Sequence, residues 1–288
     1  MILVAGGSGQ VGKWIAELGG SGVEAFSSAD LDVTNEALMR DVVGDLKPHW
    51  VINCAAHTAV DAAESEPVRA NEINAIGAKN LAGACVESGS RLVHLSTDYV
   101  FGNTKLHSEP LAEDHPCAPM SVYGRSKLAG EHAVRTVLPH ATVVRTAWVY
   151  TGPARTNLGL PGNDFVSTML ELEKSRDFLT VIDDQLGSPT FAHDLAAGLL
   201  ELVDLGAGAG KTLHAAGGGR ASWCDLARAV FEEIGADPTR VQPCGTEEFP
   251  RPAPRPAFSV LSSKGWEAAG LSPLRHWRDA VRVAVADR

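Results

Sequence analysis

Short apolar runs alternate with longer stretches of helical spacing through the first half of the chain. The runs at 2–5, 23–26, 50–55, 91–96 and 141–149 have the length of buried strands and are bounded by turn residues. Helical spacing falls between them, over 13–18, 36–46, 74–88 and 126–137. Strand and helix in alternation predict βαβ units, in which helices cover both faces of a parallel sheet. The pattern therefore predicts an α/β protein with a doubly wound parallel sheet.

The pattern loosens after about residue 150. Gly, Pro and Asn predict a loop over 151–162, and helical spacing returns at 164–174, 194–203 and 222–234, where Ser222 is a plausible N-cap. Five prolines predict an irregular segment over 243–256. The glycines of 206–212 resemble a P-loop, but the required first glycine is Leu205, so we predict a turn before a strand at 212–215.

Two domains are expected from this change of pattern. The first, 1–150, would hold the parallel sheet. The second, 151–288, would be a smaller, mostly C-terminal α/β domain that binds the substrate, with some segments returning to the sheet.

Composition narrows the class of protein. The chain has 288 residues, 44% of them apolar and 21% charged, which excludes a disordered chain, a collagen and a coiled coil. A net charge of −10 without a basic block argues against a nucleic-acid partner. No apolar run is long enough for a membrane span, and no signal-peptide pattern is present. Five scattered cysteines indicate reduced thiols, so we expect a cytoplasmic protein.

A glycine pattern follows the first predicted strand and opens the first helix. Gly6 would allow the tight turn, Gly9 the approach of a pyrophosphate, and Gly12 close packing of helix on strand. The alternative is a glycine-rich turn without a ligand. In this context we predict a Rossmann-like site for NADPH or NADH. The second strand ends in Ser27 and Ser28 instead of an acid, which favours NADPH slightly but does not separate the two cofactors.

Tyr123 and Lys127 lie one helical turn apart, so they share a helix face. The ammonium is expected to lower the pKa of the phenol, which could then donate a proton to a carbonyl oxygen. Such a pair alone is more often an exposed surface pair, and the glycine pattern is what favours catalysis here. Thr97 and Asp98 end a predicted strand, where a hydroxyl can bind the substrate carbonyl; a polar strand-end cap is the alternative.

These motifs resemble the dTDP-4-dehydrorhamnose reductase family of the extended short-chain dehydrogenases/reductases, over nearly the whole chain. The resemblance rests on segments 6–12, 55–64, 96–102, 122–131, 145–150, 184–190 and 255–261. It implies reduction of a dTDP-4-keto-6-deoxy sugar by NADPH or NADH, for the synthesis of dTDP-L-rhamnose. A related reductase of another dTDP-4-keto-deoxyhexose, or a non-catalytic regulatory subunit of the methionine adenosyltransferase type, are the alternatives.

The resemblance also implies roles for individual residues. Cofactor contacts would come from Gly6, Gly9, Gln10, Val11, Gly12, Asp32, Val33, Ala56, His57, Thr58, Tyr123 and Lys127. Tyr123, Lys127 and Thr97 would be catalytic, and Thr97, Asp98 and Trp148 would contact the sugar. Arg255 is our own candidate for the substrate pyrophosphate, because a guanidinium matches its geometry. Some relatives dimerise through magnesium with an acid just after the glycine loop. This chain has Lys13 and Trp14 there, so we expect no metal and leave a homodimer open.

Overall fold

The computed structural model describes residues 1–102, 104 and 107–286. Its centre is a six-stranded sheet in which every neighbouring pair is parallel, in the order β10-β5-β4-β3-β1-β2. The strands are β1 (Ile2–Ala5), β2 (Val23–Phe26), β3 (Trp50–Asn53), β4 (Arg91–Thr97), β5 (Thr142–Thr146) and β10 (Thr212–His214). This arrangement confirms the predicted doubly wound α/β fold.

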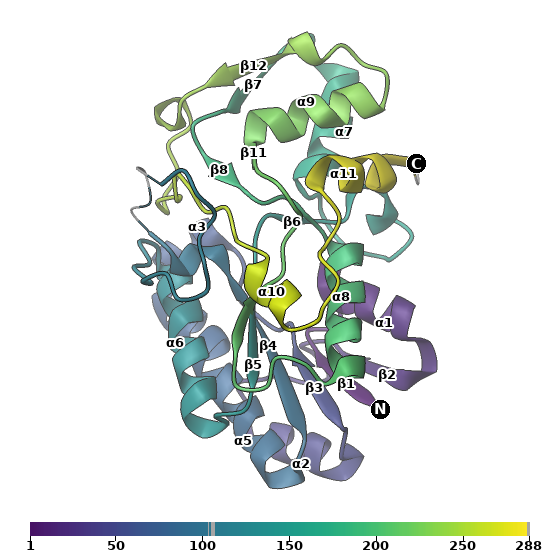
Figure 1. Cartoon of the computed structure of the whole chain (residues 1–288), viewed down its shortest axis with the longest axis vertical. Coiled ribbons are helices and arrows are strands. Elements are labelled where there is room, and N and C mark those ends of the chain that lie inside the picture. The colour runs from purple at the N-terminus through teal and green to yellow at the C-terminus, as the bar shows by residue number, and fades with distance from the viewer. Residues whose placement is uncertain (103, 105–106, 287–288) are drawn as a thin grey trace.

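Helices cover both faces of this sheet (Figure 1). One face packs against α1 (Gln10–Gly19) and α8 (Ala192–Leu205), and the other against α2 (Glu36–Leu46), α5 (Ala78–Ser88) and α6 (Val122–Val137). The strands supply apolar side chains alternately to the two layers. Val4 and Ile52 face α1 and α8, while Leu3 and Val51 face α2 and α5. This double burial explains why the strands are continuous apolar runs in the sequence.

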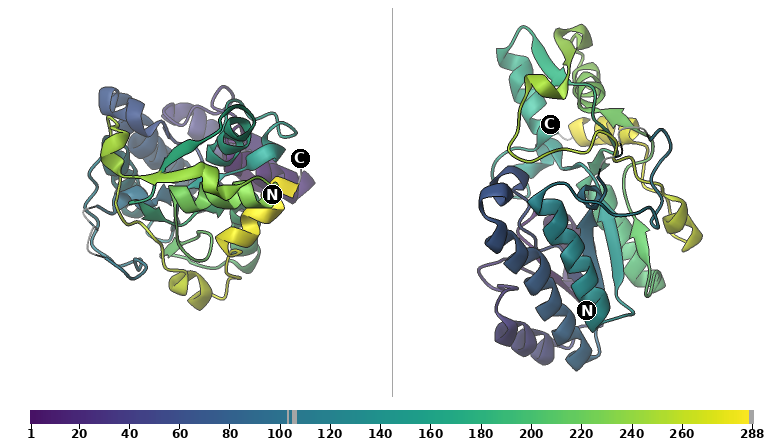
Figure 2. Two further views of the ribbon diagram at one scale, coloured as in Figure 1. Left: turned by 90° about the horizontal axis from the view of Figure 1, so that it is seen from above. Right: turned by 90° about the vertical axis from the view of Figure 1, so that its left-hand side faces the viewer.

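A smaller group of elements lies above the carboxyl ends of the strands (Figure 2). It consists of α7 (Phe165–Ser175), β7 (Leu179–Ile182), α9 (Trp223–Glu233), β12 (Val241–Cys244) and α11 (Trp277–Ala286). These elements share a separate apolar core that includes Val166, Phe231, Val241 and Val281. Ser222 caps α9 as predicted: its hydroxyl accepts from Asp225 N at 2.9 Å, and the Asp225 carboxylate accepts from Ser222 N at 3.0 Å.

Shorter elements complete the chain. They are α3 (Val60–Ser65), α4 (Pro67–Asn71), β6 (Val149–Tyr150), β8 (Leu186–Gly187), β9 (Thr190–Phe191), β11 (Ala221–Ser222), α10 (Lys264–Ala268), a π-helical turn (Glu72–Gly77) and 3₁₀ turns at Gly20–Gly22, Asp98–Val100, Gly152–Arg155, Pro238–Arg240 and Thr246–Glu248. Within the described residues, no helix has both the length and the apolar character needed to cross a membrane.

Three predicted elements differ from the structure. The helix predicted at 126–137 begins at Val122, because Ser121 accepts from Gly124 N and caps it earlier. In the helix predicted at 74–88, residues 74–77 belong to the π-helical turn and the α-helix begins only at Ala78. The strand predicted at 141–149 is broken into β5 and β6, because Trp148 takes a left-handed backbone conformation with φ of 46°.

Candidate active site

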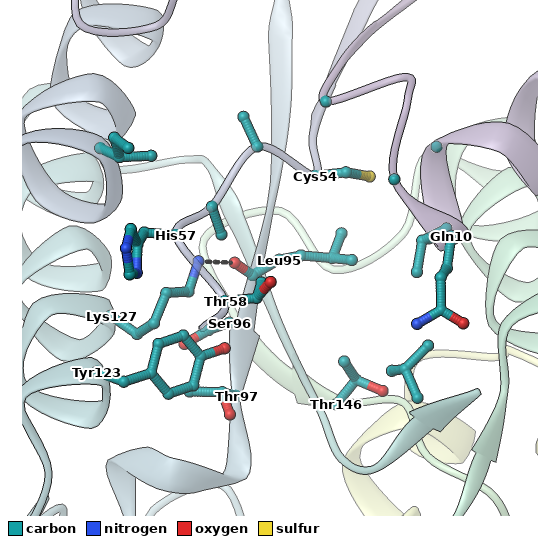
Figure 3. Close-up of a pocket in the computed structure, with 18 of the residues that line it drawn as sticks. Gln10, Cys54, His57, Thr58, Leu95, Ser96, Thr97, Tyr123, Lys127 and Thr146 are labelled. Atoms are coloured by element: carbon teal, nitrogen blue, oxygen red, sulfur yellow. Dashed lines mark hydrogen bonds between the residues drawn. The ribbon is translucent and has the colours of Figure 1, made fainter. Parts of the chain in front are cut away.

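A cleft of about 1180 Å³ lies at the carboxyl ends of β1, β3, β4 and β5. It opens beside the point where the strand order reverses, between β1 and β3, which is where doubly wound sheets bind ligands. Every site residue predicted above lines it except Arg255; they are Gly6, Gly9, Gln10, Val11, Gly12, Asp32, Val33, Ala56, His57, Thr58, Thr97, Asp98, Tyr123, Lys127 and Trp148. Segments far apart in the sequence are thus brought to one place (Figure 3).

The three glycines of the first loop have different structural roles. Gly6 has φ of 83°, and a Cβ there would lie 2.6 Å from Ala55 N. A Cβ on Gly12 would lie 2.4 Å from Gly6 O, so Gly12 is needed for packing within the loop. Among the described residues beyond its chain neighbours, a Cβ on Gly9 would come no closer than 3.4 Å, to Gly6 O, which leaves its space to a ligand. Because Gly9 caps α1 without a side chain, the first N–H groups of that helix are free to bind a pyrophosphate.

Helix α6 holds the Tyr–Lys pair and is fixed at its start by two contacts. Ser121 caps it, and the Glu64 carboxylate accepts from Val122 N at 2.7 Å. Gly124 lets the helix approach the 3₁₀ turn after β4, since a Cβ there would lie 2.2 Å from Tyr99 O. Tyr123 and Lys127 therefore point from one buried helix face into the cleft, Tyr123 toward Thr97 and Lys127 toward Leu95 (Figure 3).

The pKa of Tyr123 corrects one expectation. Burial raises it to about 12, the charge of Asp98 acts in the same direction, and a hydrogen bond with Thr97 opposes both. The expected lowering by Lys127 is wrong for the protein without ligands, because the cost of burying a phenolate exceeds the stabilisation from the hydrogen bond with Thr97. The phenol is therefore protonated throughout the physiological pH range, which is the state a proton donor needs.

The side chain of Lys127 is held in place by a backbone carbonyl of β4. Its Nζ donates to Leu95 O at 2.7 Å, and the side chain is buried. Burial lowers the pKa of Lys127 to about 8, although the carboxylate of Glu131 acts to raise it. Glu131 in turn accepts two hydrogen bonds from Arg145, at 2.9 and 2.8 Å, and one from Ser96 at 2.6 Å. The ammonium thus lies next to a carboxylate that is already neutralised.

Asp98 lies beside the phenol at the end of β4. Its Oδ1 accepts from Thr97 Oγ1 at 3.1 Å, and Ser259 also forms a hydrogen bond with its side chain. Burial raises the pKa of Asp98 to about 6 despite these hydrogen bonds. The carboxyl group can therefore act as donor or acceptor toward a ligand hydroxyl near neutral pH.

Asn74, which the sequence reasoning did not select, fixes the loop after β3. Its Oδ1 accepts from His57 N at 2.8 Å, and its Nδ2 donates to His57 O at 3.2 Å and to Ser126 Oγ at 2.8 Å. The side chain is buried in the π-helical turn. No motif marks it, because its partners lie on two other segments of the chain.

Trp148 forms one wall of the cleft together with Trp223. The two rings are stacked, with centroids 3.7 Å apart and planes 5° from parallel. Gly187 leaves room for the Trp148 ring, since a Cβ there would lie 2.4 Å from it. Trp223 donates from Nε1 to Gln185 Oε1 at 3.2 Å. No local sequence pattern marks Trp223, because its stacking partner Trp148 lies on a segment far away in the sequence.

Arg255 lies outside the residues that line the cleft. Its guanidinium forms a bidentate ion pair with Asp61, donating to Oδ1 at 2.8 Å and to Oδ2 at 2.9 Å. It also donates to Ala253 O at 2.8 Å. This pair lowers the pKa of Asp61. Its contact with a substrate pyrophosphate stays a prediction.

The doubly wound sheet, the glycine loop at the switch point and the buried Tyr–Lys pair define an oxidoreductase of the extended short-chain dehydrogenase/reductase type. The family model described as the RmlD substrate binding domain matches residues 1–288, and the chain belongs to this family. The dTDP-4-dehydrorhamnose reductase of Mycolicibacterium smegmatis is 48% identical over 99% of this chain and 85% of its own.

Two solved structures extend the comparison. The dTDP-4-dehydrorhamnose reductase from Clostridium acetobutylicum has 40% identity and a TM-score of 0.88, covering 99% of this chain and 98% of its own. The enzyme from Bacillus anthracis, solved in complex with NADP, has 34% identity and a TM-score of 0.90, covering 100% of this chain and 99% of its own. The likeness thus extends over the whole chain.

Proposed function

We propose that this protein reduces the C4 keto group of dTDP-4-dehydro-L-rhamnose to give dTDP-L-rhamnose, with NADPH or NADH as the reductant. The residues present fit such a cofactor. The glycine loop leaves a cradle at Gly9, and the buried Nδ1 of His57 on the cleft wall has no hydrogen-bond partner among the described residues. The bound cofactor supplies a hydride to the keto carbon, and the protein supplies the proton and the geometry.

Tyr123 is the proposed proton donor. Its phenol is protonated at neutral pH, so its proton can pass to the keto oxygen as negative charge develops there. Thr97, which shares a hydrogen bond with the phenol, orients the same oxygen. Lys127 stabilises the phenolate that forms and binds the nicotinamide ribose.

Substrate contacts come from the other side of the cleft. Asp98 would bind a sugar hydroxyl, Trp148 would lie against the deoxy-sugar, and Arg255 would reach the pyrophosphate if its pair with Asp61 opens. On this proposal, residues 1–150 mainly bind the cofactor and residues 151–288 mainly bind the sugar nucleotide, with α8 and β10 completing the parallel sheet.

One observation carries the proposal: a buried Tyr–Lys pair faces Thr97 within a cleft that opens at a glycine loop. A purely binding protein has no need of a buried proton donor at this place. The arrangement therefore favours catalysis over a regulatory role of the methionine adenosyltransferase type.

The test is product analysis. The protein is mixed with dTDP-4-dehydro-L-rhamnose and either NADPH or NADH, turnover is followed by loss of the reduced-nicotinamide absorbance, and the product sugar is identified by NMR. We expect dTDP-L-rhamnose in stoichiometric amount. Turnover only with a different dTDP-4-keto-deoxyhexose would identify a sibling reductase, and absence of turnover with any of these sugars would contradict the proposal.

A further inference from the structure

A buried hydroxyl on the cleft wall has no hydrogen-bond partner within the part of the chain that the structure describes. Thr146 is only 8% exposed, lines the cleft, and its Oγ1 forms no hydrogen bond with any described residue. Thr142 on the same strand is also buried, but its Oγ1 donates to Gly208 O at 2.9 Å. Because buried hydroxyls nearly always have a partner, the Thr146 hydroxyl indicates a polar group supplied by a ligand.

The position of Thr146 restricts which ligand this is. It is the last residue of β5 and pairs in register with Thr97 on β4, so it adjoins the proposed reaction centre. In the close-up, Thr146 lies on the side of Thr97 that faces Gln10 of the glycine loop (Figure 3). A dinucleotide that runs from that loop to Tyr123 and Lys127 passes this side of the cleft with its nicotinamide end.

We propose that the Thr146 hydroxyl binds the carboxamide of the nicotinamide ring. The carboxamide is the one group on that ring that both donates and accepts hydrogen bonds, and a hydroxyl can satisfy either end. The cleft is also lined by the apolar side chains of Val11, Leu95 and Val149, none of which can form a side-chain hydrogen bond with a carboxamide. Thr146 would thereby fix the rotation of the ring against the ribose held by Lys127. This inference rests on the proposed use of NADPH or NADH.

The experiment compares two ligands in fluorescence or calorimetric titrations of the whole protein. NADPH carries the nicotinamide, and 2′-phospho-ADP-ribose is the same molecule without it. Thr146→Val removes the hydroxyl at nearly constant shape, and we expect it to weaken NADPH binding by about two- to tenfold, the usual effect of one lost hydrogen bond. Binding of 2′-phospho-ADP-ribose should stay within error of wild type, and Thr146→Ser, which keeps the hydroxyl, should bind NADPH nearly normally.

Thr142→Val is the matched control, since it makes the same change on the same strand away from the cleft. Thermal unfolding of each variant checks the fold. Equal weakening of both ligands by Thr146→Val, or no weakening of either, would overturn the carboxamide assignment. A Thr146→Val protein with a raised KM for the sugar nucleotide and unchanged NADPH affinity would also overturn the assignment, because the hydroxyl would then face the substrate. Thr146-dependent NADPH binding without sugar reduction would refute only the proposed function.

Discussion

Replacing Lys127 by methionine is expected to make the protein more stable at pH 7, although it removes a residue proposed for the reaction. The side chain is 3% exposed, and burial lowers its pKa from the ordinary value of 10.5 to about 8. When the pKa of an ammonium is lower in the folded protein than in the unfolded chain, the charged group destabilises the fold at every pH at which it stays protonated. Methionine fills a similar volume without that charge.

The size of the effect follows from the contacts. The fall in pKa from 10.5 to about 8 corresponds to roughly 3 kcal/mol at pH 7. The substitution leaves Leu95 O without its donor, which costs about 1 kcal/mol. Glu131 keeps both hydrogen bonds from Arg145, so no carboxylate is left unpaired. The net gain in the free energy of unfolding is therefore about 2 kcal/mol.

The gain should depend on pH in a defined direction. Below pH 8 the folded wild type carries the buried charge, and between about 8 and 10.5 it loses the proton while the unfolded chain retains it. Wild-type stability relative to Lys127→Met therefore rises through this window. By about pH 9.5 the difference between the two proteins should have narrowed by roughly 2 kcal/mol.

Urea unfolding at both pH values measures this directly. Lys79→Met, at an exposed position of α5, is the control and should change stability little at either pH. A Lys127→Met protein that is less stable than wild type at pH 7, or whose advantage does not shrink as pH rises, would refute the reasoning.

Three further predictions test the site. Tyr123→Phe deletes the proposed proton and should lower kcat by about 10²–10⁴ with cofactor affinity nearly unchanged in NADPH titrations; turnover within about threefold of wild type would exclude this donor. Gly9→Val should weaken NADPH binding at least about tenfold without unfolding the protein, whereas Gly12→Ala should destabilise it in thermal melts, because Gly12, unlike Gly9, is closed in by protein atoms. Arg255→Ala should raise KM for the sugar nucleotide by about ten- to a hundredfold and leave cofactor affinity alone; the same rise in Asp61→Asn, which keeps the guanidinium, would mean that Arg255 acts only through the ion pair.

The sequence predicted the centre of the sheet well because strands such as β3 and β5 are buried on both faces. Short continuous apolar runs such as 50–52 are typical of strands covered by helices on both faces. The glycine loop in turn marks the end of the first strand. The pair β7 and β12 escaped prediction, because each strand is four residues long and β12 contains Pro243. Its pairing joins segments far apart in the chain, which no local pattern reports.

Within the site, the sequence correctly predicted the position of residues that are brought together by their spacing along one element. Tyr123 and Lys127 are the clearest case, since one helical turn brings them to the same face. It failed for Asn74 and Trp223, whose roles depend on partners from other segments. The predicted lowering of the Tyr123 pKa was wrong, because residue spacing reveals a neighbouring charge but not how deeply the phenol is buried.

The order in which the sheet is completed bears on how the protein is made. Its edge strand β10 and the covering helix α8 both come after residue 190, so the first 150 residues leave the ribosome with β5 unpaired on one side. The side chains of Val4, Ile52 and Val144 also lack their packing against α8 until that helix has been synthesised. A nascent chain in this state presents an open strand edge beside an apolar face, the combination that promotes misassembly and recruits chaperones. The cofactor cleft at the N-terminal glycine loop thus becomes stable only after most of the chain has been synthesised.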